Sequence, residues 1–417
     1  MSKIHIIGGK KLEGSLGIQG SKNAALPVLA ATLLTEGINV LENCPQISDV
    51  KEMLEILLGL CCDVWEKEGK LFIKAPKKLS NRLDKEHIIS MRSSVILLGV
   101  LLSENGAVCM EYPGGCVIGK RPIDMHIRGL EKMGCYFEHT KKVLCANTKG
   151  LQGAQIYLHF PSVGATENLI LAAVKAKGDT VIYGAAKEPE IIHLCEYLNN
   201  CGARIKGAGT ERIQIEGVLQ LSACKYKIPS DRIVAGTYLM CALATRGYVR
   251  LKNAPVKEME AVLKVLNKMG AAVWVEKGEL WIDGAVPLRG CFVETGVYPG
   301  FPTDLQSPML VLMSQVMGKG MIKETIYENR FHIVHELHKM KSGMQIAGNE
   351  VAVCGPEKLN GAIVRAKELR GNAALVMAGM VANGETTILD CKYVKRGYED
   401  ICRDLRSLGA IIDEKED

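Results

Sequence analysis

Two kinds of helix are predicted by the spacing of apolar residues along the chain. One kind is apolar around most of its surface, which predicts burial on all sides. The other carries one apolar stripe and one charged face, as in residues 262–269, which predicts an outer helix followed by short strands, as in 272–282. We therefore expect strands and outer helices wrapped around a core of buried helices, whose sequences are 24–34, 95–102, 238–244, 308–317 and 373–381.

These elements recur along the chain. The outer helix that turns into a strand appears six times, from 53–62 to 404–409. Six units divide into two sets of three, with crossings near Ser21 and near 229–231. We expect one domain at 22–229 and another at 1–21 plus 230–417, where the first strand joins the C-terminal half. A second landmark is a glycine at the exit of each buried helix, with a period of roughly 70 residues. These glycines are Gly37, Gly106, Gly178, Gly247, Gly320 and Gly384.

Length and composition agree with this division. A chain of 417 residues is too long for one core of ordinary size. Apolar runs such as 95–102 are far shorter than the roughly 20 residues of a membrane span, so no transmembrane helix is expected. The first five residues lack the apolar block of a signal peptide, which predicts a cytoplasmic protein.

Cysteine and charge patterns narrow the class of function. The 15 cysteines are odd in number and form no Cys-x-x-Cys, which favours buried thiols in a reducing compartment over disulfides or zinc. His332, His335 and His338 have helical spacing, but nothing completes a metal site, so a solvated helix face is favoured. We expect no metal and no cofactor. The net charge of +6 comes without a Lys/Arg tract, which fits small anionic substrates and predicts no nucleic-acid, membrane or obligate protein partner.

The segment 113–122 carries the first candidate for chemistry. Its three glycines and two prolines predict a loop, and Cys116 lies in it beside Lys120 and Arg121. Neighbouring cations lower a thiol pKa, so proton transfer or nucleophilic attack by Cys116 is one interpretation. A tight turn with an incidental cysteine is the other.

Two helix starts are candidate anion sites. Ser21 can cap the first buried helix, and Lys22 would add a full charge for a phosphate, although a solvated lysine at a domain crossing is the alternative. The third buried helix opens with Ser162, Val163 and Gly164, where the glycine would let a phosphate approach the backbone.

Arginines near unit boundaries suggest carboxylate or phosphate binding, with surface salt bridges as the competing interpretation. They are Arg92, Arg330, Arg370 and Arg396. Asp304 precedes a buried helix and could be an N-cap, or a general base if the domains bring it near the Cys116 loop.

As a set, these segments resemble the UDP-N-acetylglucosamine 1-carboxyvinyltransferases, the MurA family. The resemblance implies an α/β fold of two inside-out, barrel-like domains, each with three repeated units around buried helices in pseudo-threefold symmetry, and an active site in the interdomain cleft. It also implies transfer of the enolpyruvyl group of phosphoenolpyruvate to the 3'-hydroxyl of UDP-N-acetylglucosamine, with release of phosphate, in peptidoglycan precursor synthesis. The residues that carry it lie at 18–25, 91–94, 113–126, 160–166, 302–306, 328–331 and 396–399.

The resemblance also implies roles for single residues. Cys116 would donate a proton to the phosphoenolpyruvate methylene and form a covalent adduct, and Asp304 would be the base on the sugar hydroxyl. Lys22, Arg121 and Arg396 would hold the phosphoenolpyruvate anions. The remaining substrate-binding set, mainly for the sugar nucleotide, is Asn23, Arg92, Pro122, Ile123, Asp124, Met125, Ser162, Val163, Gly164, Ile326, Arg330 and Arg370, with Asp304 and Arg121 also included.

Some positions depart from the family pattern. Lys395 and Glu368 stand where aspartates are usual, and Val234 stands where glutamate is common. They motivate one alternative, a weakly active or non-catalytic paralogue that binds UDP-N-acetylglucosamine. A 3-phosphoshikimate 1-carboxyvinyltransferase is a second alternative, against which the cysteine loop argues.

Overall fold

The computed structural model describes residues 2–80, 92–112, 119, 122–139, 143–365 and 367–416. Contacts between described residues divide the chain into two compact units. The N-terminal unit holds the described residues between 20 and 229 except Gly119, and the C-terminal unit holds the described residues of 2–19 and 230–416 together with Gly119. Each unit has its own apolar core.

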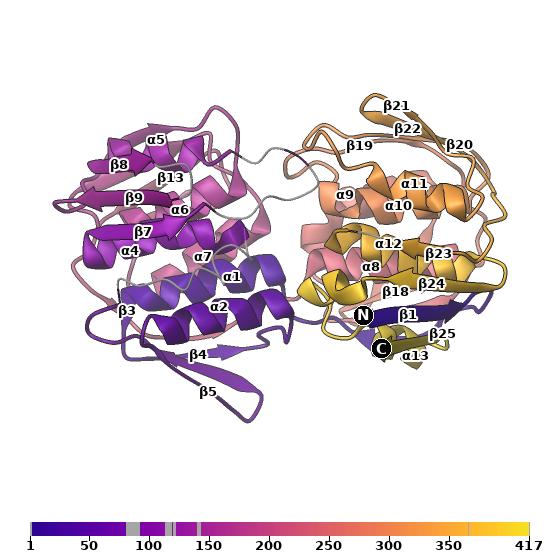
Figure 1. The fold of residues 1–417 in the computed structure, drawn as a ribbon, viewed down its shortest axis with the longest axis horizontal. Helices are drawn as coiled ribbons and strands as arrows, with labels where there is room; N and C mark the ends of the chain where they lie inside the picture. The colour runs from indigo at the N-terminus through magenta and orange to yellow at the C-terminus, as the bar shows by residue number, and fades with distance from the viewer. Residues whose placement is uncertain are drawn as a thin grey trace. The chain divides into compact units, whose positions relative to one another are not determined.

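Three buried helices form the core of the N-terminal unit, drawn from indigo to magenta (Figure 1). They are α1 (Lys22–Ala31), α4 (Leu97–Asn105) and α6 (Val163–Ala173), and α4 contacts both of the others. Short 3-10 helices extend α1 at Thr32–Leu34 and precede α4 at Arg92–Ile96. Amphipathic helices pack outside this core: α2 (Ser48–Gly59) against α1, α5 (Asp124–Lys132) against α6, and α7 (Pro189–Asn200) against α1 and α6.

A small sheet accompanies each helix pair of this unit. The strand orders are β15-β4-β6-β5, β7-β9-β8 and β10-β11-β13-β12, and β3 pairs with β14. Apolar residues alternate along these strands, so one face covers the helices and the other meets solvent. The bounds are β3 (Thr35–Glu36), β4 (Ile38–Glu42), β5 (Asp63–Lys67), β6 (Lys70–Lys74), β7 (Ala107–Glu111), β8 (Cys135–His139), β9 (Val143–Thr148), β10 (Gln155–Tyr157), β11 (Asp179–Tyr183), β12 (Arg204–Lys206), β13 (Arg212–Glu216), β14 (Leu221–Ser222) and β15 (Lys225–Lys227).

The C-terminal unit repeats this plan. Its buried helices, α8 (Arg232–Ala244), α10 (Gln306–Ser314) and α12 (Leu369–Val381), contact one another. The outer helices are α9 (Glu260–Lys268), α11 (His332–Lys339) and α13 (Ile401–Ser407). Short 3-10 helices lie at Val256–Met259, Thr303–Leu305 and Cys391–Arg396.

Three four-stranded sheets cover these helices, in the orders β17-β18-β16-β2, β19-β20-β22-β21 and β23-β24-β1-β25. In each, the strand after a buried helix pairs in parallel with one neighbour and antiparallel with another, as β20 does with β19 and β22. The bounds are β2 (Glu13–Gly17), β16 (Tyr248–Lys252), β17 (Ala272–Glu276), β18 (Glu279–Asp283), β19 (Phe292–Glu294), β20 (Gly318–Lys323), β21 (Gln345–Ala347), β22 (Glu350–Gly355), β23 (Ile363–Arg365), β24 (Glu385–Leu389) and β25 (Ile411–Glu416).

The first strand belongs to the C-terminal unit, as predicted. β1 (Ser2–Ile7) lies antiparallel between β24 and β25, with Ile4 opposite Ile388 and Glu414. Figure 1 shows both chain ends in this unit, beside β1 and β25. The N-terminal strand therefore completes the sixth sheet, which the last repeat could not fill from its own sequence.

One landmark of the repeat is corrected by the structure. Gly106 ends α4 in the left-handed conformation with φ of 68°, as a helix-exit glycine should. Gly320 instead lies within β20, and Gly318 holds the positive φ of 87°. At Gly247 the left-handed residue is its neighbour Arg246, with φ of 56°. The period holds, but in these two units Gly318 and Arg246 take the left-handed conformation instead of the predicted glycines.

The expectation of unpaired cysteines is wrong at one place. Cys109 on β7 and Cys145 on β9 form a disulfide. They lie directly opposite each other in the antiparallel register, with Cα atoms 4.1 Å apart. The two cysteines are 36 residues apart in the sequence, so their pairing could be predicted only from the register of the strands.

Among the described residues, no helix is long and apolar enough to cross a membrane.

Candidate functional site

The N-terminus of α1 brings a lysine against a buried acid. Ser21 caps the helix by accepting a hydrogen bond from the backbone N–H of Ala24 at 3.3 Å, as predicted. Lys22 Nζ lies 2.5 Å from Asp49 Oδ2 in the first turn of α2. The two side chains are only 14% and 5% exposed, so the interpretation of Lys22 as a solvated lysine is wrong. Asn23, the next residue of α1, is half-buried.

The starts of α5 and α6 lie against each other. Ser162 caps α6 by accepting from the N–H of Ala165 at 3.4 Å, and a Cβ on Gly164 would lie 3.5 Å from the His126 ring of α5. His126 Nδ1 is in turn 2.9 Å from Asn168 Nδ2 on α6. The structure thus brings together two predicted segments, 123–125 and 162–164, at one end of this helix pair.

The side chains of these two segments are partly available to a ligand. Ile123 precedes α5, and Asp124 and Met125 form its first turn; all three are half-buried, as are Val163 and Gly164. Pro122 is exposed. Arg92 begins the 3-10 helix that contacts α1 and α6, and its side chain is half-buried. Cys116 and Arg121 lie outside the described residues.

In the C-terminal unit, Asp304 lies between two buried arginines. Asp304 Oδ1 accepts from Arg330 Nη2 at 2.7 Å, and Oδ2 accepts from Arg370 Nη2 and Nε at 2.9 and 3.1 Å. The side chains of Arg330 and Arg370 are 2% and 4% exposed, whereas that of Asp304 is 29% exposed. For these two arginines the surface salt-bridge interpretation is wrong. Asp304 is not the side-chain cap of α10 either, because that helix begins without one.

Electrostatics fixes the charge state of this cluster. Burial alone would raise the pKa of Asp304, but the Arg370 and Arg330 guanidiniums bring it well below its usual range. The pKa of each guanidinium is raised in turn, because the attraction of Asp304 outweighs the burial that would lower it. The carboxylate is therefore ionised at neutral pH and positioned to accept a hydrogen bond from a ligand hydroxyl at its exposed edge.

The cluster also has spare hydrogen-bond donors. Arg330 Nε and Arg370 Nη1 are buried and have no hydrogen-bond partner among the described residues. A buried donor left unpaired costs about 1–3 kcal/mol, so such atoms are usually paired by a ligand or by water. Two guanidinium nitrogens of the cluster thus carry donors that the described residues leave unpaired.

The N-terminus of α12 positions Arg370. Glu368 caps this helix by accepting from the backbone N–H groups of Arg370, at 2.7 Å, and Gly371. Glu368, which the sequence marked as a departure, therefore acts as the side-chain cap of α12. Its negative charge also helps to raise the pKa of Arg330.

The other departures from the family pattern are accommodated locally. Lys395 Nζ forms an ion pair with Glu414 Oε1 at 2.7 Å, which balances the reversed charge beside Arg396. Arg396 ends the 3-10 helix Cys391–Arg396, which packs against α12, and it is half-buried. Val234 is fully buried in α8, where an apolar side chain needs no partner. Ile326 follows β20, and its N–H is held by Glu324.

Three residues of the site had no signal in the sequence. Asp49 holds Lys22 and Thr303 holds Arg330, in each case across 27 positions of the sequence. Glu324 holds the backbone N–H of Ile326, two positions away in a turn. No spacing rule joins a lysine at a helix start to an acid on the following helix. Thr303 is adjacent to Asp304 in the sequence, yet its hydrogen bond to Arg330 depends on the fold.

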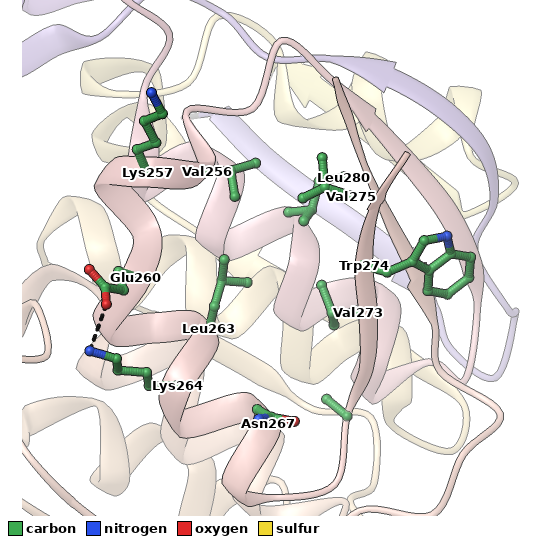
Figure 2. A pocket seen from close by; sticks show the side chains of 11 residues that line it. Val256, Lys257, Glu260, Leu263, Lys264, Asn267, Val273, Trp274, Val275 and Leu280 are labelled. Carbon is green, nitrogen blue, oxygen red and sulfur yellow. Dashed lines mark ion pairs between the residues drawn. The ribbon is translucent and has the colours of Figure 1, made fainter. Parts of the chain in front are cut away.

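Other candidates do not converge on chemistry. His338 Nε2 lies 2.7 Å from the carbonyl of Met344, and the described part of the chain holds no group of three or more metal-ligating side chains. A hollow between α9 and strands β17 and β18 is lined mainly by aliphatic side chains and Trp274, and Figure 2 shows the Glu260–Lys264 ion pair of 2.6 Å at its side. It contains none of the predicted site residues.

With this geometry in place, the class of the protein follows from its relatives. The family model of EPSP synthase (3-phosphoshikimate 1-carboxyvinyltransferase) matches residues 6–405. The chain belongs to this family of carboxyvinyltransferases, with a mixed α/β fold, and the resemblance predicted from the sequence is confirmed. More particularly, it is 41% identical over 415 residues to UDP-N-acetylglucosamine 1-carboxyvinyltransferase 1 of Halalkalibacterium halodurans. The matched region covers 99% of this chain and 94% of the relative.

Solved structures share the fold. The enolpyruvyl transferase NikO from Streptomyces tendae matches with a TM-score of 0.91 at 22% identity, over 99% of both chains. An EPSP synthase from Acinetobacter baumannii matches with a TM-score of 0.79 at 19% identity, over 100% of both chains. At these identities the likeness extends to the fold alone.

Proposed function

We propose that this protein transfers the enolpyruvyl group of phosphoenolpyruvate to the 3'-hydroxyl of UDP-N-acetylglucosamine and releases phosphate. The observation that carries the proposal is the 41% identity, over nearly the whole of both chains, to a relative with that name. Lys22, Cys116, Arg121, Asp304 and Arg396, the residues to which the family resemblance gives catalytic or phosphoenolpyruvate-binding roles, are all present. The product would enter peptidoglycan synthesis in the cytoplasm.

The proposed reaction is an addition followed by an elimination. Cys116 gives a proton to the methylene carbon of phosphoenolpyruvate, and the sugar oxygen bonds to the adjacent carbon as Asp304 takes the hydroxyl proton. Loss of a proton from the new methyl group then expels phosphate and restores the double bond. Ionised at neutral pH, Asp304 is in the form that can accept a proton, although its low pKa makes it a weak base while both guanidiniums remain in place.

Charge complementarity supports the substrate assignment. Phosphoenolpyruvate and a nucleotide sugar are both anions, and the proposal gives Lys22, Arg121 and Arg396 to the former. The sugar nucleotide is assigned to Asn23, Arg92, Asp304, Ile326, Arg330 and Arg370, and to residues 122–125 and 162–164. No metal, cofactor or protein partner takes part in this scheme.

The finer architecture is part of the same proposal. Each unit would be an inside-out α/β barrel with pseudo-threefold symmetry, consistent with three buried helices and their sheets in each. Residues of both units, such as Lys22 and Asp304, would act on the same pair of substrates. The domain limits would be those predicted, 22–229 and 1–21 plus 230–417.

Two alternatives make different predictions. A 3-phosphoshikimate 1-carboxyvinyltransferase would use shikimate 3-phosphate as acceptor, and Cys116 in its glycine-rich loop argues against it. A non-catalytic paralogue would bind UDP-N-acetylglucosamine without turnover. The Lys395–Glu414 pair and the Glu368 cap weaken the reasons for that alternative, because both substitutions are compensated.

Phosphate release tests the proposal. The purified protein is mixed with phosphoenolpyruvate and, in separate reactions, with UDP-N-acetylglucosamine or shikimate 3-phosphate. The proposal predicts phosphate release with the sugar nucleotide and none with the shikimate derivative. Binding of UDP-N-acetylglucosamine without release would favour the non-catalytic paralogue.

A further inference from the structure

A buried acid outside the predicted site is bonded at both of its oxygens. Glu324 directly follows β20 and is 2% exposed. Its Oε1 accepts from the backbone N–H groups of Ile326 and Tyr327 at 2.8 and 3.1 Å, and its Oε2 accepts from Thr303 Oγ1 at 2.8 Å. Asn349 holds the backbone of Glu324 through hydrogen bonds of 2.8 and 3.0 Å. The carboxyl group is therefore fixed in one orientation.

The Thr303 hydroxyl links the Glu324 carboxyl group to Arg330 through two hydrogen bonds. A hydroxyl has one proton to donate, and Thr303 gives it to Glu324. Its oxygen lone pairs are then free to accept from Arg330 Nη1 at 3.0 Å. Arg330 Nη2 donates to Asp304 Oδ1 at 2.7 Å, so hydrogen bonds connect Glu324 through Thr303 and Arg330 to Asp304.

The second arm of Glu324 reaches another predicted substrate contact. Its bonds to the N–H groups of Ile326 and Tyr327 close the turn after β20. The Arg330 guanidinium also lies 5.3 Å from the centre of the Tyr327 ring, which ties this turn to the arginine. One carboxyl group thus fixes the two segments that present Asp304 and Ile326.

We propose that Glu324 is a positioning residue for the sugar-nucleotide acceptor, acting through Thr303 and Arg330 on Asp304 and through the backbone on Ile326. It touches no substrate itself. This inference rests on the proposed function and deepens it, because Glu324 would align the acceptor hydroxyl without contacting either substrate.

Glu324→Gln is the sharpest single change because it keeps the size of the side chain. If the amide oxygen keeps the two backbone N–H groups, the amide nitrogen must face Thr303 as a donor. The Thr303 oxygen would then accept from both the Gln amide and Arg330, and the threonine proton would lose the carboxylate that now accepts it. We expect kcat to fall about 10- to 100-fold and the KM for UDP-N-acetylglucosamine to rise, with the KM for phosphoenolpyruvate within twofold of wild type.

Variants at Thr303 test the chain of hydrogen bonds independently of any change to the turn. Thr303→Val removes the hydroxyl and should reproduce the loss in kcat seen with Glu324→Gln. Thr303→Ser keeps the hydroxyl and should restore kcat to within about threefold of wild type. The double variant Glu324→Gln/Thr303→Val should lose little more than either single variant, since both break one chain.

The outcomes separate this proposal from the function on which it rests. Wild-type turnover of UDP-N-acetylglucosamine is measured first, and its absence would overturn the function itself. With an active wild type, unchanged kcat in Thr303→Val, or an equal loss in Thr303→Ser and Thr303→Val, would overturn the role of Glu324. These threonine variants decide the question even if Glu324→Gln does not fold, and urea unfolding of each variant confirms that folded proteins are compared.

Discussion

Asp304 and Arg370 form a two-point ion pair inside the C-terminal unit, in which Asp304 Oδ2 accepts from both Nη2 and Nε of the arginine. With Arg330 on the other carboxylate oxygen, one acid pairs with two cations that are almost fully buried. Removing an acid from such a cluster is costly because it leaves buried charge without compensation. The same carboxylate is also the proposed base, so both stability and activity should depend on Asp304.

Asp304→Asn should therefore lower both the stability of the protein and its activity. We expect a loss of about 3 kcal/mol in the free energy of unfolding, measured by urea titration, and loss of turnover. The lowered pKa of Asp304 means that its stabilisation is present above the carboxyl pKa of the unfolded chain, about 4, and is lost as pH falls through the folded-state value. The difference between wild type and variant should be constant near neutral pH and shrink in strong acid; a constant difference down to that range would contradict the ion-pair account.

Glu167 should respond to pH in the opposite direction. Burial raises its pKa well above the ordinary value, and nearby Glu190 and Glu188 add to the effect. The folded state then holds a proton that the unfolded chain releases, so stability is lost as pH rises toward the folded-state pKa. The unfolding free energy of Glu167→Gln relative to wild type should increase from pH 5 to pH 8, by at most about 1.4 kcal/mol per pH unit. A relative stability that is flat with pH would show that Glu167 is ionised in the folded protein.

Lys22→Gln tests the cation at the start of α1. A hydrogen bond to a charged group contributes about 1.5–3 kcal/mol, so we expect kcat/KM for phosphoenolpyruvate to fall about tenfold to a hundredfold. Lys51→Gln, on the exposed side of α2, is the matched control and should leave kcat/KM unchanged. Equal effects of the two changes would indicate a general charge effect instead of a phosphate contact.

Cys116 is expected to act as an acid. Cys116→Ala should abolish turnover, whereas Cys116→Asp, which keeps a proton donor, should retain part of it. The epoxide fosfomycin should alkylate Cys116, detected by peptide mass, and UDP-N-acetylglucosamine should promote the reaction. Cys354→Ala, which removes an exposed free thiol, is the control with unchanged turnover and labelling. Protection of Cys116 by the sugar nucleotide would contradict this expectation.

The Cys109–Cys145 disulfide should stabilise the N-terminal unit when it forms. A cross-link that closes a loop of 36 residues contributes up to about 4 kcal/mol in the chain-entropy model. Cys109→Ser/Cys145→Ser should therefore unfold at lower urea than oxidised wild type and match wild type that has been reduced. Cys61→Ser, at an exposed free thiol, should not differ from wild type. Two free thiols at positions 109 and 145 in the oxidised protein would contradict the pairing.

Much of this fold was predictable because its signal is periodic. Helices that are apolar all round, such as α10 and α12, must be buried, and their repetition at a fixed interval predicted the two sets of three units. The return of β1 was also expected, but the count of repeats did not establish it; the pairing with β24 and β25 does. Gly320 was misplaced because Gly318, two residues earlier, holds the left-handed conformation, and the sequence does not distinguish the two glycines.

In the candidate site, the sequence singled out charged residues but not the groups that hold them. Lys22, Asp304, Arg330 and Arg370 are charged residues at helix starts or unit boundaries, and the family resemblance gave them roles. Glu324 and Asp49 carry no such signal, because their importance lies in hydrogen bonds to segments brought near by folding. The pairing of Cys109 with Cys145 depends in the same way on a strand register that composition does not specify.

A competition experiment shows which acceptor the protein uses. The wild-type protein is given phosphoenolpyruvate together with equal concentrations of UDP-N-acetylglucosamine and shikimate 3-phosphate, and the products are identified by mass spectrometry. The account predicts that enolpyruvyl-UDP-N-acetylglucosamine accumulates in step with phosphate while shikimate 3-phosphate is unchanged. Enolpyruvyl transfer to shikimate 3-phosphate, or no transfer to either acceptor, would contradict it.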